Sequence, residues 1–143
     1  LFINLYEPDP MDGEYPGIQG DRKKKNILRR AMSLFHLAKA GGLKIGPLEV
    51  LESRLYRTGK YDHVYTPTHD FQFPDEGLRF YFNKDRLSHL TIRPSGTGNA
   101  LRLHIQLHSN VDAHNLLEKK ADLRAAGQQI MDDVREKLGA QRG

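Results

Sequence analysis

The sequence predicts a two-layer α+β domain, in which a roughly four-stranded, mainly antiparallel sheet carries two helices on one face. Two segments near the ends of the chain, 21–40 and 112–138, place apolar residues at helical spacing. Between them, over residues 78–107, apolar and polar residues alternate as in half-buried strands. A chain of 143 residues is long enough for one domain with a core and too short for two sizeable ones.

Residues 1–20 are rich in proline, glycine and acidic residues, and we expect a linker or hinge tail there, with one short strand possible near residues 2–6. The domain proper is expected over residues 21–138. Its first helix should begin with Asp21 as N-cap and end at Gly41-Gly42. Five apolar residues form the inner face of this helix: Ile27, Ala31, Leu34, Phe35 and Ala38.

The first turn of that helix carries the basic run 22–25, followed by Arg29 and Arg30. Such a run suits a nucleic-acid interface, but it is also typical of the solvated face of an amphipathic helix, which we favour. Four cations at a helix N-terminus oppose the helix dipole by roughly a few tenths of a kcal/mol each. This local conflict hints that an anionic surface, such as a neighbouring domain, faces them.

Residues 43–55 resemble a strand interrupted at Gly46-Pro47, which favours an edge position because proline cannot donate to a sheet. Residues 56–75 are polar and show no clear period, and such a length is unusual for a loop in a compact domain. A short strand at 61–65 is one way to interpret part of that segment.

Three clearer strands follow at 78–82, 87–93 and 101–108, the first two joined by a polar turn at 83–86. The last of them alternates most strictly, so one of its faces should be core and the other wet or covered by polar groups. A helix should then run from about residue 112 to 138, capped by Asn110 or Asp112, and residues 139–143 should be frayed.

The loop between the last two strands combines residues that suit a phosphate group. Residues 93–99 spell Arg-Pro-Ser-Gly-Thr-Gly-Asn: a guanidinium fork, two hydroxyls and two glycines. Glycine lets the backbone N–H groups approach an anion closely and adopt positive φ. The alternative is an ordinary connection, since Pro-Ser-Gly also makes good turns. The residue types alone leave both interpretations open.

The run Arg93-Pro94-Ser95-Gly96-Thr97 resembles the phosphate-binding loop in the last domain of the phosphohexomutases, the superfamily of phosphoglucomutase and phosphomannomutase. The order of helix, strands, loop, strand and final helix over residues 21–138 is also similar to that domain. Many members continue with an acidic residue and a proline, whereas Gly98 and Asn99 follow here, which blurs the subfamily. In a full-length mutase, residues 1–20 correspond to the hinge from the preceding domain.

By their chemistry and their position in the family loop, seven residues are candidate phosphate contacts: Arg93, Ser95, Gly96, Thr97, Gly98, Asn99 and Arg102. Arg93 would supply the charge-assisted fork, the hydroxyls and glycine amides the remaining hydrogen bonds. Arg102 opens the next strand and can add long-range attraction, although a plain surface cation fits equally well.

The resemblance also implies what the chain does not contain. Phosphohexomutases transfer a phosphoryl group through a phosphorylated serine, in a Thr-Ala-Ser-His-Asn type loop, with Mg²⁺ held by an Asp-x-Asp-x-Asp run. Neither run is present in these 143 residues, so we expect no catalytic residue, cofactor or metal here. The seven histidines form no recognised zinc ligand set, although His104 and His108 should share a strand face.

Three functions remain in order of preference. The first is a phosphate-binding domain of a phosphoglucomutase-like enzyme, whose partners are hexose phosphates and the other domains of the parent protein. The second is a stand-alone sugar-phosphate or anion-binding module, and the third a nucleic-acid-binding domain using the basic helix. A net charge of +4 favours anionic partners in all three. The lack of cysteine and of a long apolar run suggests a cytoplasmic protein without membrane contact.

Overall fold

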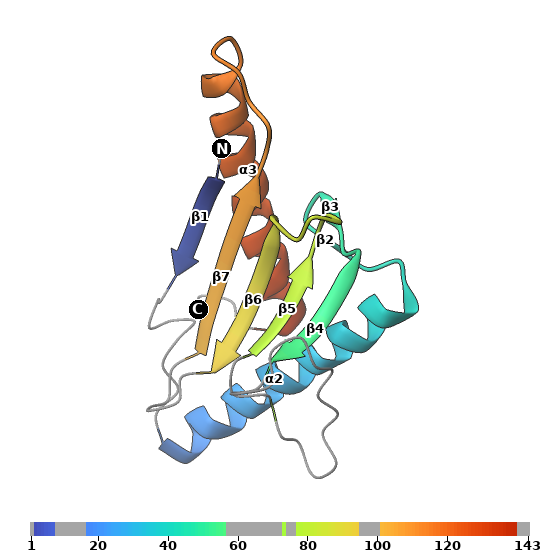
Figure 1. Cartoon of the computed structure of the whole chain (residues 1–143). Helices are drawn as coiled ribbons and strands as arrows, with labels where there is room; N and C mark the ends of the chain where they lie inside the picture. The colour runs from blue at the N-terminus through green and yellow to red at the C-terminus, as the bar shows by residue number, and fades with distance from the viewer. Residues whose placement is uncertain (1, 8–16, 57–72, 74–76, 95–100, 140–143) are drawn as a thin grey trace.

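A computed structural model describes residues 2–7, 17–56, 73, 77–94 and 101–139. Its main feature is a five-stranded sheet in the order β1-β7-β6-β5-β4, in which every neighbouring pair is antiparallel (Figure 1). The strands are β1 (Phe2–Glu7), β4 (Glu52–Tyr56), β5 (Gly77–Tyr81), β6 (His89–Pro94) and β7 (Leu101–His108). The predicted α+β class is confirmed, with one strand more than expected.

Helices α2 (Gly17–Ala40) and α3 (Leu116–Leu138) cover one face of this sheet and contact each other (Figure 1). The alternation of β7 is the clearest link from sequence to packing: its odd-numbered leucines and isoleucine are fully buried, and the residues between them are half-buried. The core lies between this face and both helices, where Phe80, Ile92 and Ile130 are fully buried. We call the other side the outer face of the sheet.

The short strand that the sequence allowed near residues 2–6 is present within the N-terminal segment. Residues 2–7 form β1, which pairs along β7 from Phe2 opposite His108 to Glu7 opposite Leu103. Without β1, the long strand β7 would present a row of unpaired backbone groups at the sheet edge. Helix α2 also begins at Gly17 rather than at Asp21, since the intervening residues contain no helix breaker other than one glycine. Residues 8–16 lie outside the described part of the chain.

Gly46-Pro47 turns a small hairpin instead of interrupting one strand. The hairpin consists of β2 (Lys44–Ile45) and β3 (Leu48–Glu49), and β4 follows as an edge strand of the main sheet. The Gly46 N–H donates to Oδ2 of Asp133 on α3 at 2.7 Å, while Lys137 Nζ donates to the other oxygen at 2.7 Å. This carboxylate therefore ties the hairpin to the last helix.

The polar turn at 83–86 is confirmed, with the Phe82 N–H donating to the Ser88 carbonyl at its base. The predicted cap of the last helix is wrong. Asn115 precedes the first helical turn, while Asp112 Oδ1 accepts the N–H groups of His114 and Asn115 in a turn before the helix. The possible strand at 61–65 and the frayed residues 140–143 lie outside the described residues.

Asp133 offers a test of the hairpin attachment. Burial raises the pKa of Asp133, but hydrogen bonds from Lys137 and the Gly46 N–H outweigh it and hold the pKa below its usual value. Its contribution to stability is therefore present above the unfolded-state pKa and is lost as pH falls through the lower, folded-state pKa. We expect Asp133→Asn to lower the free energy of unfolding by about 1 kcal/mol at neutral pH.

Urea unfolding at neutral pH and at a pH of about 3 measures this effect, which should shrink at the acidic pH because the Asp133 carboxyl of the unfolded chain is then largely protonated. Asp122→Asn, on an exposed position of the same helix, is the matched control and should change neither curve. An equal loss for Asp133→Asn at both pH values would show that its charge contributes nothing.

Candidate functional site

The outer face of the sheet is polar and rich in arginine. Strand pairing arranges its residues in rows that cross the sheet, because residues directly opposite one another in an antiparallel pair point to the same side. The row next to the 95–100 loop contains Tyr56, Gly77, Arg93 and Arg102, and the next contains Arg54, Arg79, Thr91 and His104. The third row contains Glu52, Tyr81, His89 and Gln106.

Arg93 and Arg102 lie directly opposite each other at the ends of β6 and β7. They flank the predicted phosphate loop, so two of the seven candidate residues are described by the structure and meet at its base. Ser95, Gly96, Thr97, Gly98 and Asn99 lie outside the described residues. Arg93 is exposed, and none of the described residues forms a hydrogen bond or ion pair with its side chain.

Two like charges opposite each other across a strand pair are destabilising unless something compensates them. For Arg93, which is exposed, an anion can supply this compensation. The sequence interpretation would have failed if Arg93 had been buried against a carboxylate of this chain, and among the described residues it is not.

Gly77 on β5 makes room for Arg93. It has a φ of +95°, and a Cβ placed on it would lie 2.5 Å from the Ile92 carbonyl oxygen and 3.1 Å from the Arg93 Cβ. A side chain at this position would therefore push β6 away at the residue that carries the guanidinium. The sequence gives little sign of this role, because the cross-strand neighbour depends on register.

Arg79 is held at the middle of the outer face. Its guanidinium carbon lies 5.4 Å from the ring centre of Tyr56 and 6.0 Å from that of Tyr81, at distances that suit cation–π attraction. The hydroxyls of the two tyrosines are hydrogen-bonded to each other at 2.5 Å, which fixes both rings. The Nε of Arg79 donates to the Thr91 hydroxyl oxygen at 2.9 Å.

Glu52 is already shared by two other arginines. Arg54 donates to one of its oxygens at 2.7 Å, and Arg86 donates to both at 2.9 Å. Burial raises the pKa of Glu52, but the hydrogen bonds and charges of Arg54 and Arg86 outweigh it and keep the pKa below its usual value. The backbone of Arg86 has a φ of +64°, which is uncommon outside glycine. Its guanidinium group also lies over the Tyr81 ring.

His89 and His104 lie near Arg79, and the centres of their two rings are 6.1 Å apart. Burial, followed by the charges of Arg79 and His104, lowers the pKa of His89 to about 4. Burial and the Arg79 charge also lower the pKa of His104. His104 and His108 share the outer face, as predicted, but within the described ranges no three metal-binding side chains of His, Cys, Asp or Glu come together.

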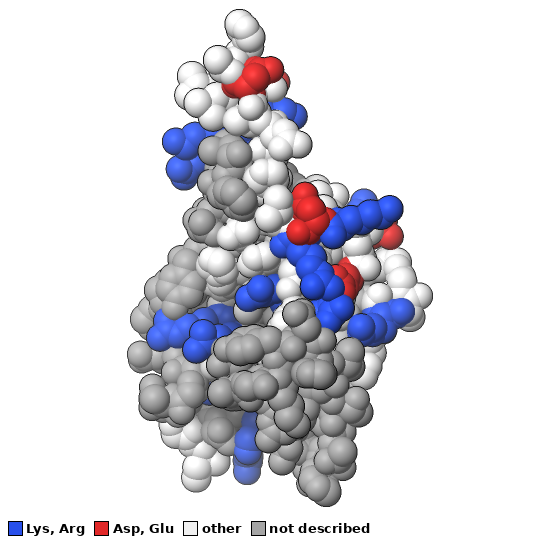
Figure 2. Space-filling view, in the orientation of Figure 1, with Lys and Arg blue, Asp and Glu red and all other residues white. Residues whose placement is uncertain are grey.

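Figure 2 shows the face of the molecule that Figure 1 presents to the viewer. Lysine and arginine side chains gather over the middle of the sheet, with few acidic side chains among them. Glu52 is the one acidic residue in the three rows that the structure describes, and it is taken up by its two arginines. The outer face therefore carries an excess of positive charge and suits a small anion.

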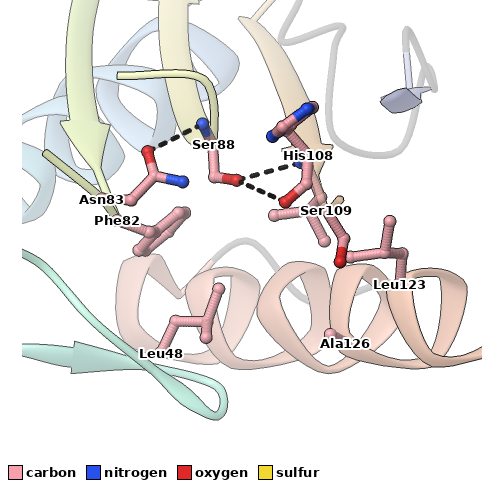
Figure 3. Close-up of a pocket in the computed structure, with 9 residues that line it drawn as sticks. Leu48, Phe82, Asn83, Ser88, His108, Ser109, Leu123 and Ala126 are labelled. Atoms are coloured by element: carbon pink, nitrogen blue, oxygen red, sulfur yellow. Dashed lines mark hydrogen bonds between the residues drawn. The ribbon is translucent and has the colours of Figure 1, made fainter. Parts of the chain in front are cut away.

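A hollow of about 220 Å³ lies at the end of β6 and β7 away from Arg93 and Arg102, between the sheet and α3 (Figure 3). Leu48, Phe82 and Leu123 supply apolar walls, and Ser88 lies at the polar rim. The Ser88 hydroxyl already accepts the His108 N–H at 3.0 Å, and none of the described residues lining the hollow is a lysine or arginine. The hollow therefore does not suit a phosphate.

Neither a protein-family model, nor a curated protein, nor a solved structure matches this chain. Within the described residues, no helix is both long and apolar enough to cross a membrane. The function must therefore be argued from the site itself.

Proposed function

We propose that this chain is the phosphate-binding domain of a phosphoglucomutase-like enzyme, which interconverts hexose 1-phosphate and hexose 6-phosphate. The observation that carries the proposal is the opposed pair Arg93 and Arg102 at the two ends of the 95–100 loop. Two guanidinium groups at one sheet end, joined in the sequence by a segment with two hydroxyls and two glycines, would provide the donors that a phosphate dianion requires.

The role of such a domain is to position the substrate. It holds the phosphate that is not being transferred, so that the free hydroxyl of the sugar meets the phosphorylated serine elsewhere in the enzyme. Binding energy at this remote phosphate orients the reacting centre. Donors directed at the phosphate rather than at the sugar also allow the loop to accept either end of a bisphosphate intermediate.

The proposal assigns no chemistry to this chain alone. In the family, Mg²⁺ is held by an aspartate run that these residues do not contain, and the described side chains offer no alternative metal cluster. We therefore expect phosphotransfer only in a longer polypeptide that includes the remaining domains, and we place that enzyme in the cytoplasm. A stand-alone sugar-phosphate-binding module is the alternative, since it would use the same donors.

An NMR titration tests the site directly. Adding a hexose 1-phosphate should shift the amide resonances of Gly96 and Gly98, whereas the same hexose without phosphate should leave them unchanged, because the donors act on the phosphate. A short oligonucleotide serves as the competing ligand. Saturable shifts confined to Lys23–Lys25 with the oligonucleotide, and none at Gly96 and Gly98 with the sugar phosphate, would favour the nucleic-acid function instead.

A further inference from the structure

The arrangement around Arg79 is not used by the proposed loop site. Thr91 holds Nε of this arginine, and two tyrosine rings lie beside its guanidinium group, so the side chain is fixed in one place. Its two terminal nitrogens form no hydrogen bond with any described residue, and no described carboxylate pairs with it. A fixed guanidinium with its terminal fork available is preorganised for a planar or tetrahedral oxyanion.

The charges around Arg79 are not balanced within the described residues. Glu52 is engaged by Arg54 and Arg86, and Arg54 itself lies opposite Arg79 across the β4–β5 pair. The Arg79 charge contributes to the lowered pKa of both nearby histidines, which places an uncompensated positive potential at the same point. A bound anion would lower this potential.

His89 supplies a second, independent observation. It is only 8% exposed, and its Nδ1 atom is buried without any hydrogen-bond partner. A buried polar atom without a partner costs free energy, and such atoms in native proteins often mark a site for water, an ion or a ligand. The ring lies next to His104, which is half-buried and belongs to the same row as Arg79 and Thr91.

We propose that Arg79, His89 and His104 form a second oxyanion site in the middle of the outer face, which takes a phosphate group as inorganic phosphate or as a phosphate monoester. Thr91 is a positioning residue that orients the guanidinium. The site is one row from Arg93 and Arg102, a distance of about 7 Å along the strands. The donors of this second site come from the strands, so its binding does not require the 95–100 loop.

The test is a titration of the whole chain with inorganic phosphate, compared with sodium chloride at the same ionic strength. Imidazole resonances of His89 and His104 are followed by NMR as a function of pH. A bound anion favours the protonated imidazole, so phosphate should raise the pKa of His104 by about 1, whereas chloride should not. In the rows of the sheet that carry His89, His104 and Arg79, the other charged residues on neighbouring strands are Glu52 and Arg54 on β4, with Arg93 and Arg102 one row away.

Two variants separate this site from the loop. Arg79→Gln should abolish the phosphate-induced change in pKa, while Arg93→Gln should leave it intact. Arg124→Gln, an exposed arginine on α3, is the matched control and should behave as the unmodified chain. A change that disappears in Arg93→Gln and persists in Arg79→Gln would overturn the second site and leave the loop proposal standing.

An equal response to chloride would also overturn the inference, because it would reflect general screening. If Arg79→Gln loses the native circular dichroism spectrum, His104→Gln replaces it, with His89 as the reporter. The shift of the His89 imidazole resonances on adding phosphate should then be at least about tenfold smaller than in the unmodified chain. An undiminished response of His89 would contradict the participation of His104.

Discussion

Replacing Arg93 with glutamine should weaken binding of a hexose 1-phosphate by roughly 10- to 150-fold, the equivalent of the 1.5–3 kcal/mol typical of a hydrogen bond to a charged group. Arg93 is exposed at the end of β6 and has no partner among the described residues, so a ligand does not have to displace an existing ion pair with them. Isothermal titration calorimetry with the sugar phosphate measures the change. In the full-length enzyme, the same substitution should raise KM or lower kcat/KM.

For the same variant we expect no loss of stability, in contrast to its loss of binding. Without ligand, Arg93→Gln should leave the free energy of unfolding unchanged or raise it by a few tenths of a kcal/mol, because it removes the repulsion with Arg102 across the strand pair. A structural arginine would behave in the opposite way. Loss of stability together with unchanged phosphate binding would refute the assignment of Arg93.

Arg124→Gln is the charge-matched control, since it removes one exposed positive charge on α3, far along the chain from the loop. It should lower phosphate affinity only through the weak long-range field. Arg102→Gln should weaken phosphate binding more than Arg124→Gln does and less than Arg93→Gln does. If Arg93 and Arg102 contact the same phosphate, the double variant will lose less than the sum of the single losses, because residues that share a partner are coupled.

Much of this architecture follows from local sequence patterns. The alternation of residues 101–108 gives β7, and the polar turn at 83–86 gives the β5–β6 hairpin. The loop motif singles out Arg93 by its chemistry. The edge strand β1 is harder to foresee, because a short apolar run beside prolines becomes a strand only when a long strand such as β7 offers it an unpaired edge.

The Arg79 arrangement was missed for a related reason. Alternation shows which residues of one strand point outward, but not which residues of different strands meet. The signal was present in part: the turn at 83–86 fixes the register of its hairpin and so places Arg79 opposite Thr91. The addition of His104 to this row depends on the β6–β7 register, which the connecting loop motif does not specify.

Gly77→Ala should be the most damaging single substitution at the candidate site, with a loss of about 3 kcal/mol or more in the free energy of unfolding. A φ of +95° alone costs a side-chain-bearing residue about 1–2 kcal/mol. The larger part comes from the 2.5 Å approach of the new Cβ to the Ile92 carbonyl oxygen, a backbone atom that cannot rotate away. Relief requires β5 and β6 to separate at Arg93.

Gly41→Ala separates these two contributions. Gly41 has a similar φ of +89°, but a Cβ on it would meet nothing within 4 Å, so this variant carries the backbone strain without the clash. Thermal and urea unfolding of both proteins should show a melting temperature lower by roughly 6–12 °C for Gly77→Ala, and clearly less for Gly41→Ala. Equal losses would mean that the strands accommodate the methyl group and that the positive φ alone accounts for the loss at Gly77.

The affinity of folded Gly77→Ala and Gly41→Ala for hexose 1-phosphate is a second measurement on the same two variants. Because the Cβ would also lie 3.1 Å from the Arg93 Cβ, strand separation displaces Arg93 from its position opposite Arg102. Gly77→Ala should therefore weaken hexose 1-phosphate binding, although Gly77 itself carries no donor side chain, whereas Gly41→Ala should bind normally. Normal binding in both variants would show that the loop holds its ligand independently of the β5–β6 contact.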